Sequence, residues 1–235
     1  KSILEQIEAN NRLSEEKKIP LCQDTGQVLV FLEVGSKVYW EGDIEAAINH
    51  GVREGSKKGY LRNSVVTHPL NRINTGDNTP AIIHTKISPG DKVKITIVPK
   101  GGGSENVSLV KMLTPADGEE GLKKLVLETI LEAGGRPCPP IIVGIGIGGN
   151  LEKAAMLAKE ALLRDIDDQA SNPYDRKLEE NLLQEINNLG LGPMGLGGTT
   201  TALAVKVNSY PCHIASFPVA INIQCHAARH KSIII

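Results

Sequence analysis

The stretch Ile141–Asn150, which reads IIVGIGIGGN, decides the fold class of this chain. Its short apolar run predicts a buried strand, and the closely spaced glycines at its end predict a turn. Asn150 can cap the helix that the pattern of residues 151–163 predicts. A buried strand, a glycine turn and a helix in immediate succession indicate an α/β fold.

The segments on either side of this stretch continue the alternation of strands and helices. Strands are predicted at 28–34, 81–87, 92–98, 200–208 and 214–223, and helices at 43–58, 121–133 and 175–189. They predict a mixed sheet flanked by helices, with room for a small helical subdomain, in one domain over residues 1–235. A helical pattern begins directly at Lys1, so we expect that an N-terminal helical segment is truncated here.

The composition excludes several classes of protein. The 235 residues carry a formal net charge of -1 and only 3% aromatic residues, which argues against nucleic-acid binding. No apolar run approaches the roughly 20 residues that cross a bilayer, so no membrane association is expected. Four cysteines are too few for a secreted disulfide scaffold, and we expect a reducing, cytoplasmic location.

Cys22, Cys138 and Cys225 stand in three loop-like stretches rich in small, polar or proline residues. Thiols so widely separated are poorly placed to pair as disulfides, whereas iron–sulfur clusters are held by cysteine thiolates. Three thiolates would leave one iron of a cube open to act as a Lewis acid. The structural alternatives are a buried thiol before an ordinary turn at Cys22 and a chance thiol in a proline-rich turn at Cys138.

The sequence gives weaker support to two other kinds of site, a zinc site and a dinucleotide-binding site. Cys212-His213 and Cys225-His226 suggest zinc, but no Cys-x2-Cys pair accompanies them. Glycines 144, 146 and 149 can be fitted to a dinucleotide fingerprint, yet no second strand with an acidic end follows. The helix after these glycines could hold a carboxylate at its N-terminus or simply pack closely on the strand.

Arg62 and Arg72 flank a polar loop that also contains His68. An arginine side chain can bind a carboxylate through two parallel hydrogen bonds, as a small diacid substrate requires. For a single arginine, the alternative is an ordinary solvated surface residue.

Ordered motifs along nearly the whole chain resemble one family, the iron-dependent class I fumarate hydratases and L(+)-tartrate dehydratases. The matching stretches are Ile19–Gly26, Leu61–Ser64, Asn74–Pro80, Lys100–Asn106, Cys138–Pro140, Gly144–Gly149 and Gly190–Cys225. Each motif alone is weak, but the set in this order is specific. The sequence resembles the α chain of this family, which exists either as one long polypeptide or as separate α and β chains.

The resemblance implies that Cys22, Cys138 and Cys225 bind a [4Fe-4S] cluster, whereas Cys212 matches no ligand position. It implies substrate contacts for a second set of residues: Gln23, Asp24, Arg62, Gly103 and His213. Asp24 and His213 are the implied catalytic residues, with Asp24 orienting a threonine of the β part.

The implied reaction is the reversible hydration of fumarate to L-malate, a step of the tricarboxylic acid cycle, in an α2β2 hetero-oligomer. No counterpart of the β part is present, so the chain alone is expected to be catalytically incomplete. The nearest alternative is L(+)-tartrate dehydration to oxaloacetate by the same machinery. A non-catalytic nucleotide- or zinc-binding module is a more distant alternative.

Overall fold

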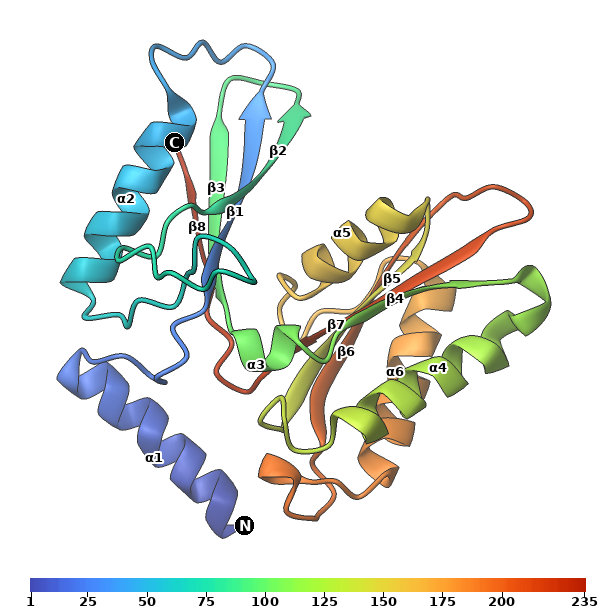
Figure 1. The fold of residues 1–235 in the computed structure, drawn as a ribbon. Coiled ribbons are helices and arrows are strands. Elements are labelled where there is room, and N and C mark those ends of the chain that lie inside the picture. The colour runs from blue at the N-terminus through green and yellow to red at the C-terminus, as the bar shows by residue number, and fades with distance from the viewer. The chain divides into compact units, whose positions relative to one another are not determined.

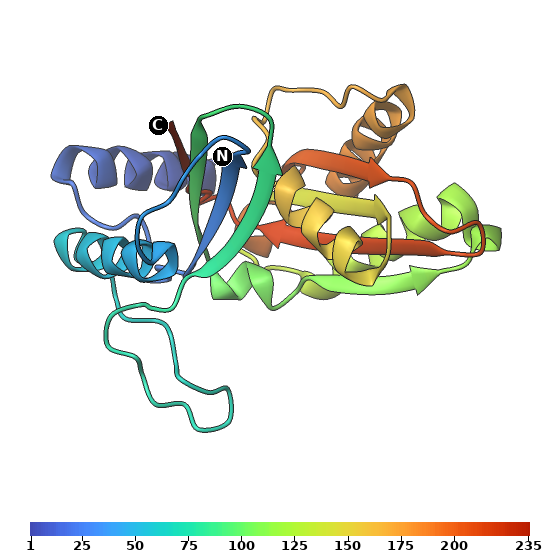
Figure 2. The same cartoon turned by 90° about the horizontal axis from the view of Figure 1, so that it is seen from above.

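A computed structural model describes residues 1–235 as two compact units (Figures 1 and 2). Unit 1 comprises Lys1–Gly102 and Ala227–Ile235, and unit 2 comprises Gly103–His226. Unit 1 contains α1 (Ser2–Lys17), β1 (Gln27–Gly35), α2 (Ile44–Lys58), β2 (Ile82–Ser88), β3 (Val93–Lys100) and β8 (Lys231–Ile234). Short helix α3 (Gly102–Glu105) starts at the boundary.

Unit 2 contains four strands, three longer helices and two short 3-10 helices. They are β4 (Leu109–Leu113), η1 (Pro115–Asp117), α4 (Gly118–Ala133), β5 (Ile141–Gly148), α5 (Leu151–Ala161), α6 (Pro173–Asn188), η2 (Pro193–Gly195), β6 (Ala202–Tyr210) and β7 (Phe217–Gln224). No helix of the structure is long and apolar enough to cross a membrane.

Unit 1 is a four-stranded sheet in the order β2-β1-β3-β8 with α2 packed on it (Figure 1). β1 pairs in parallel with β2 and antiparallel with β3, and β8 adds to the far side of β3. Asp43 accepts a hydrogen bond from the Ala46 N–H and caps α2. Ile48 and Val52 of α2 then pack against the sheet residues Val28 and Val30.

Unit 2 is a layered α/β structure around the sheet β4-β7-β5-β6. Figure 1 shows α5 on one face and α4 and α6 on the other. Successive side chains of β5 point to opposite faces of the sheet, so alternate residues pack against the two helical layers. Val143 and Ile145 join the core with α4 and α6, whereas Ile142 packs with Leu162 on the side of α5.

Gly144 and Gly146 of β5 allow α5 to pack closely on the strand. A Cβ atom at Gly144 would overlap the carbonyl oxygen of Ala158, and one at Gly146 would overlap that of Ala154, both on α5. Only glycine lets the helix backbone approach the strand this closely. The pattern that resembled a dinucleotide fingerprint is therefore explained by packing of α5 on β5.

The structure confirms the predicted α/β class and the mixed sheets flanked by helices. Both units contain a sheet, so neither is the small helical subdomain that the sequence left open. β2 and β3 follow each other along the chain but do not pair, because β1 lies between them. β4 and β8 were not predicted from sequence. The single domain over residues 1–235 and the truncated N-terminal segment stay predictions.

Candidate active site

Unit 1 presents Cys22, Gln23 and Asp24 on one tight loop. The Cys22 thiol is exposed, and the Asp24 N–H lies 3.4 Å from its sulfur as a donor. Asp24 Oδ1 accepts a hydrogen bond of 3.0 Å from the Gly26 N–H, which closes the turn. Gly26 has φ +77° and lies against the backbone of Lys100, where a Cβ atom would overlap it. The loop is thus held on the end of β3.

Arg62 is anchored beside this loop through its main chain. The hydroxyl of buried Thr25 donates a 2.6 Å hydrogen bond to the Arg62 carbonyl, which also accepts one of 3.2 Å from the amide of Asn78. Ser64 Oγ lies 2.9 Å from Thr25 Oγ1 and completes the cluster. The guanidinium group of Arg62 is therefore carried on a backbone that Thr25 ties to the Cys22 loop.

The long loop between α2 and β2 is ordered by its own polar side chains (Figure 2). Asn74 Nδ2 donates a hydrogen bond to the Asn63 carbonyl, and Asn63 Nδ2 donates one to the Gly76 carbonyl. Hydrogen bonds from the Thr79 hydroxyl and from Arg53 lower the pKa of Asp77 from 3.8 to about 2. Asp77 is therefore a structural anion of this loop at neutral pH.

Two of the three predicted thiol ligands, Cys138 and Cys225, stand on neighbouring segments of unit 2. The Cys138 carbonyl accepts a 2.9 Å hydrogen bond from the imidazole Nδ1 of His226, the residue directly after Cys225. Cys138 has φ +55°, so its backbone turns sharply just before β5. β5 and β7 are antiparallel, with Ile142 opposite Gln224, which brings the start of one strand to the end of the other.

Gly103 lies at the same end of unit 2. A Cβ atom at Gly103 would be 3.6 Å from the carbonyl oxygen of Arg136, two residues before Cys138. Glu105, which ends α3, pairs with Lys159 of α5 and accepts a 2.9 Å hydrogen bond from Asn222 of β7. This network fixes the turn that carries Gly103 to the strand that leads to Cys225.

His213 lies at the opposite end of β7. The turn before this strand is closed by a 2.8 Å hydrogen bond from the Ser216 N–H to the His213 carbonyl. The Pro211 carbonyl accepts a hydrogen bond from the Gly149 N–H, beyond the far end of β5. The structure therefore brings Gly103, Cys138 and Cys225 together, but does not bring His213 to them.

The distance between the two ends of β7 also argues against a zinc site formed by both Cys-His pairs. Cys212-His213 and Cys225-His226 flank the eight residues of β7 on opposite sides. The two pairs therefore cannot share one metal ion.

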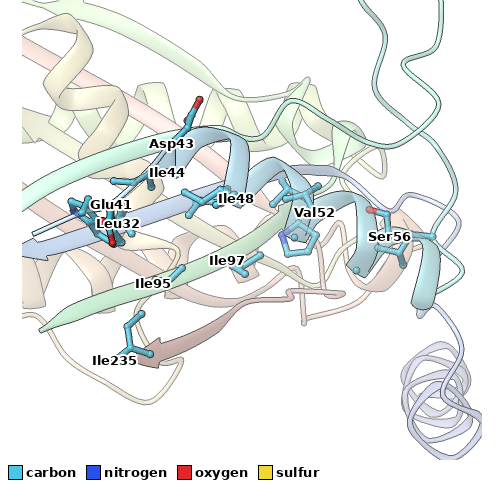
Figure 3. Close-up of a pocket in the computed structure, with 18 residues that line it drawn as sticks. Leu32, Glu41, Asp43, Ile44, Ile48, Val52, Ser56, Ile95, Ile97 and Ile235 are labelled. Atoms are coloured by element: carbon cyan, nitrogen blue, oxygen red, sulfur yellow. The ribbon is translucent and has the colours of Figure 1, made fainter.

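An apolar cavity of about 690 Å³ lies in unit 1, between α2 and the face of β1 and β3 (Figure 3). Its wall includes Ile48, Val52, Ile95 and Ile97, with Asp43 at its margin. None of the predicted site residues lines it, and its two carboxylates are Glu41 and Asp43, of which Asp43 caps α2. The cavity is therefore separate from the candidate active site.

A family model described as "Fumarate hydratase (Fumerase)" matches residues 1–234. The chain belongs to this family. Among its relatives is the "Putative L(+)-tartrate dehydratase subunit alpha" of Methanocaldococcus jannaschii, 48% identical over 236 residues. That match covers 97% of this chain and 82% of the relative.

A second relative is the "L(+)-tartrate dehydratase subunit alpha" of Escherichia coli (strain K12). It is 34% identical over 220 residues, covering 92% of this chain and 72% of the relative. The comparisons confirm that this member of the fumarate hydratase family is a hydro-lyase.

The donor set of this fumarate hydratase family member suits an iron–sulfur cluster. All four cysteines are thiols, and Cys138 and Cys225 are partly exposed on adjacent segments. Thiolates are the ligands that such clusters take. Cys22 belongs to the other unit, so the convergence of all three sulfur atoms stays a prediction.

Sequence reasoning missed two residues that hold the loop of Cys22 and Asp24. Arg229 donates a 2.9 Å hydrogen bond from Nη2 to the Asp24 carbonyl, and Thr25 anchors Arg62 as described above. Arg229 stands four residues after Cys225, outside the matching stretches, so no sequence pattern singled it out. Thr25 was visible only as part of an ordinary Asp-Thr-Gly turn.

Proposed function

We propose that the chain is the α subunit of an L(+)-tartrate dehydratase that acts with a β subunit. The observation that carries this is the pair of α-subunit relatives at 48% and 34% identity, both named for tartrate. The sequence alone favoured fumarate hydration, with tartrate as the alternative. The names of the relatives reverse this order. The α2β2 assembly and the cytoplasmic location stay predictions.

Cys22, Cys138 and Cys225 are the proposed ligands of a [4Fe-4S] cluster. When bound, such a cluster supplies an electron-poor iron without a protein ligand, which favours departure of a hydroxyl group as water. The hydrogen bond from His226 to the Cys138 carbonyl supports this, because it holds the Cys138 and Cys225 segments side by side.

The other proposed site residues bind and orient the diacid. Arg62 can hold one carboxylate through two hydrogen bonds, on a backbone fixed by Thr25. Gln23 is exposed beside Asp24 and can donate its amide N–H groups, as can the main-chain N–H of Gly103. Arg229 holds the Asp24 carbonyl, and the Gly26 N–H donates to the Asp24 carboxylate, so this carboxylate is positioned to orient a catalytic group of the β subunit.

The proposed reaction is a β-elimination. A hydroxyl group leaves one carbon of tartrate as water, and a base from the β subunit takes the proton of the neighbouring carbon. The resulting enol converts to the ketone oxaloacetate, so no oxidant or reductant is needed. In the fumarate reaction, the same elimination from L-malate gives the alkene directly.

Fumarate hydration is the second candidate, because the family model carries that name. The experiment is to reconstitute the chain with its β subunit under anaerobic conditions and to measure kcat/KM for L(+)-tartrate and for L-malate. A preference for tartrate of about tenfold or more, about 1.4 kcal/mol in the transition state, supports the proposal. A preference for malate assigns the enzyme to fumarate, and activity on neither substrate refutes both.

A further inference from the structure

Arg229 is a partly buried cation that uses little of its hydrogen-bonding capacity. Its Nη2 donates one hydrogen bond, to the Asp24 carbonyl at 2.9 Å, and its Nε is buried without an acceptor. The partly buried Arg164, by comparison, pairs with the carboxylates of Asp168 and Glu179. A guanidinium group has five N–H donors and stays charged, and buried donors without a partner are rare. Arg229 is therefore suited to a neighbouring anion.

The charge of Arg229 lies beside the loop that carries Cys22. Arg229 and Asp24 belong to the same unit, and the Asp24 N–H lies 3.4 Å from the Cys22 sulfur. Only the main chain of Asp24 separates Nη2 of Arg229 from this sulfur, so the two atoms are at most roughly 10 Å apart. The hydrogen bond to the Asp24 carbonyl also holds the backbone of the loop. Arg229 therefore acts on Cys22 both through its charge and through the loop.

Arg229 is also close to Cys225 along the chain. The two residues are four positions apart. Even a fully extended chain therefore keeps the Arg229 backbone within roughly 14 Å of Cys225, in any arrangement of the two units. Two of the three proposed cluster ligands are thus connected to one residue, Cys22 through a hydrogen-bonded loop and Cys225 through the chain. A residue in this place limits how far the Cys22 loop and Cys225 can move apart.

The diacid substrate is a second anion of the proposed site, but Arg229 is poorly placed to bind a carboxylate. Two parallel hydrogen bonds need two neighbouring N–H groups of the guanidinium fork. The Nε of Arg229 is covered, and its Nη2 already donates to a carbonyl group. Arg62, by contrast, is exposed. Arg62 therefore fits the diacid, whereas Arg229 fits an anion whose charge it compensates without a bidentate contact.

We propose that Arg229 is a positioning residue of the iron–sulfur cluster. Each cysteine thiolate brings a negative charge to this group, whose reduction potential depends on its net charge and on the hydrogen bonds around it. Arg229 holds the Cys22 loop through the Asp24 carbonyl and supplies a positive charge that compensates the thiolates. The inference rests on the proposed function, because that function provides the cluster.

The test compares Arg229→Gln, which removes the charge, with Arg229→Lys, which keeps it. Each variant is reconstituted anaerobically with iron, sulfide and the β subunit, and the midpoint potential of the cluster is measured by a redox titration followed by electron paramagnetic resonance. Arg229→Gln should shift this potential to more negative values, because reduction adds a negative charge that the cation no longer stabilises. Arg229→Lys should restore most of the shift.

A second measurement on the same complexes is the rate at which a chelator removes iron. Arg229→Gln should lose iron about tenfold faster than wild type, which is the usual size of effect when a residue that supports metal ligands is removed. Arg229→Lys should stay close to the wild-type rate. Arg12→Gln on α1 is the matched control, since its side chain is 66% exposed, and it should change neither the potential nor the rate.

An unchanged potential and an unchanged rate of iron loss in Arg229→Gln would overturn the proposal. Equal effects in Arg229→Gln and Arg229→Lys, including loss of iron binding in both, would overturn it as well, because the charge would then have no part. If Arg229→Gln alone binds no iron, the charge is needed for assembly, which supports the proposal. A wild-type complex that binds no iron, or that binds iron but converts neither tartrate nor malate, refutes the proposed function instead.

Discussion

The side chain of Thr25 positions Arg62, a proposed substrate-binding residue, without contacting the substrate itself. Its hydroxyl is buried and donates to the Arg62 carbonyl at 2.6 Å, so the backbone of Arg62 is held beside Asp24. Arginine binds carboxylates with high angular precision, and small shifts of its backbone weaken that geometry. Thr25 therefore links folding of the Cys22 loop to the substrate binding that is proposed for Arg62.

Thr25→Val keeps the shape of this side chain and removes its hydroxyl. The Arg62 carbonyl loses its shortest hydrogen bond, so the free energy of unfolding should fall by about 1–3 kcal/mol. KM for the diacid should rise more than kcat falls, because binding geometry is affected first. Urea unfolding and steady-state kinetics measure both effects. Thr25→Ser, which keeps the hydroxyl, is the control, and equal behaviour of the two variants would contradict this role.

Asp77 predicts a pH dependence of stability. Its folded pKa is lowered from 3.8 to about 2, chiefly by the Thr79 hydroxyl and by Arg53. A lowered carboxyl pKa stabilises the fold above the unfolded value, and this contribution is lost as the pH falls through the folded value. The Tm difference between wild type and Asp77→Asn should be constant above about pH 5 and shrink between about pH 4 and pH 2. A difference that grows on acidification would be incompatible with this assignment.

At the scale of elements, the contact between α5 and β5 depends on the absence of two side chains. Gly146→Ala would place a methyl group into the Ala154 carbonyl and push the helix off the strand. We expect a loss of about 3 kcal/mol or more in the free energy of unfolding. Gly51→Ala on α2 is the matched control, since a Cβ there meets no atom within 4 Å. That change should stabilise the helix by about 0.5–1 kcal/mol.

The junction of α3, α5 and β7 positions the turn of Gly103. Lys159→Met removes the cation that pairs with Glu105 and should cost only about 1 kcal/mol, because the pair is partly exposed. The effect on catalysis should be larger, with kcat/KM falling about tenfold, because the Gly103 turn loses one of the two interactions that hold Glu105. Lys124→Met breaks the exposed pair with Glu128 and should change neither quantity. An unchanged kcat/KM for Lys159→Met would show that this junction does not position the active site.

At the scale of the whole molecule, the proposed cluster would take its ligands from both units. Replacing Cys22, Cys138 or Cys225 by serine should each abolish binding of the about four irons that a full cube holds. Cys212→Ser should retain them, because Cys212 stands with His213 beyond the far end of β7. Iron and acid-labile sulfide assays after anaerobic reconstitution measure this. Full iron content in any of the first three variants would exclude that cysteine as a ligand.

Much of the local structure could be read from the sequence because it depends on neighbouring residues. The apolar run of β5 and the cap Asn150 act within a few positions, and the structure confirms both. The family was also accessible, since its motifs are short and ordered. β8 escaped prediction because four residues contain too little periodicity, and its place depends on pairing with β3.

The sequence by itself determined the α/β class, the main helices and strands and the residue types that a hydro-lyase site needs. Only the tertiary structure decided that β1 separates β2 from β3, that Thr25 anchors Arg62, and that Cys138 meets the Cys225 segment. It also placed His213 a full strand away from Cys225. The physical reason is that strand pairing and loop anchoring join residues far apart in the chain, whereas sequence patterns report interactions between near neighbours.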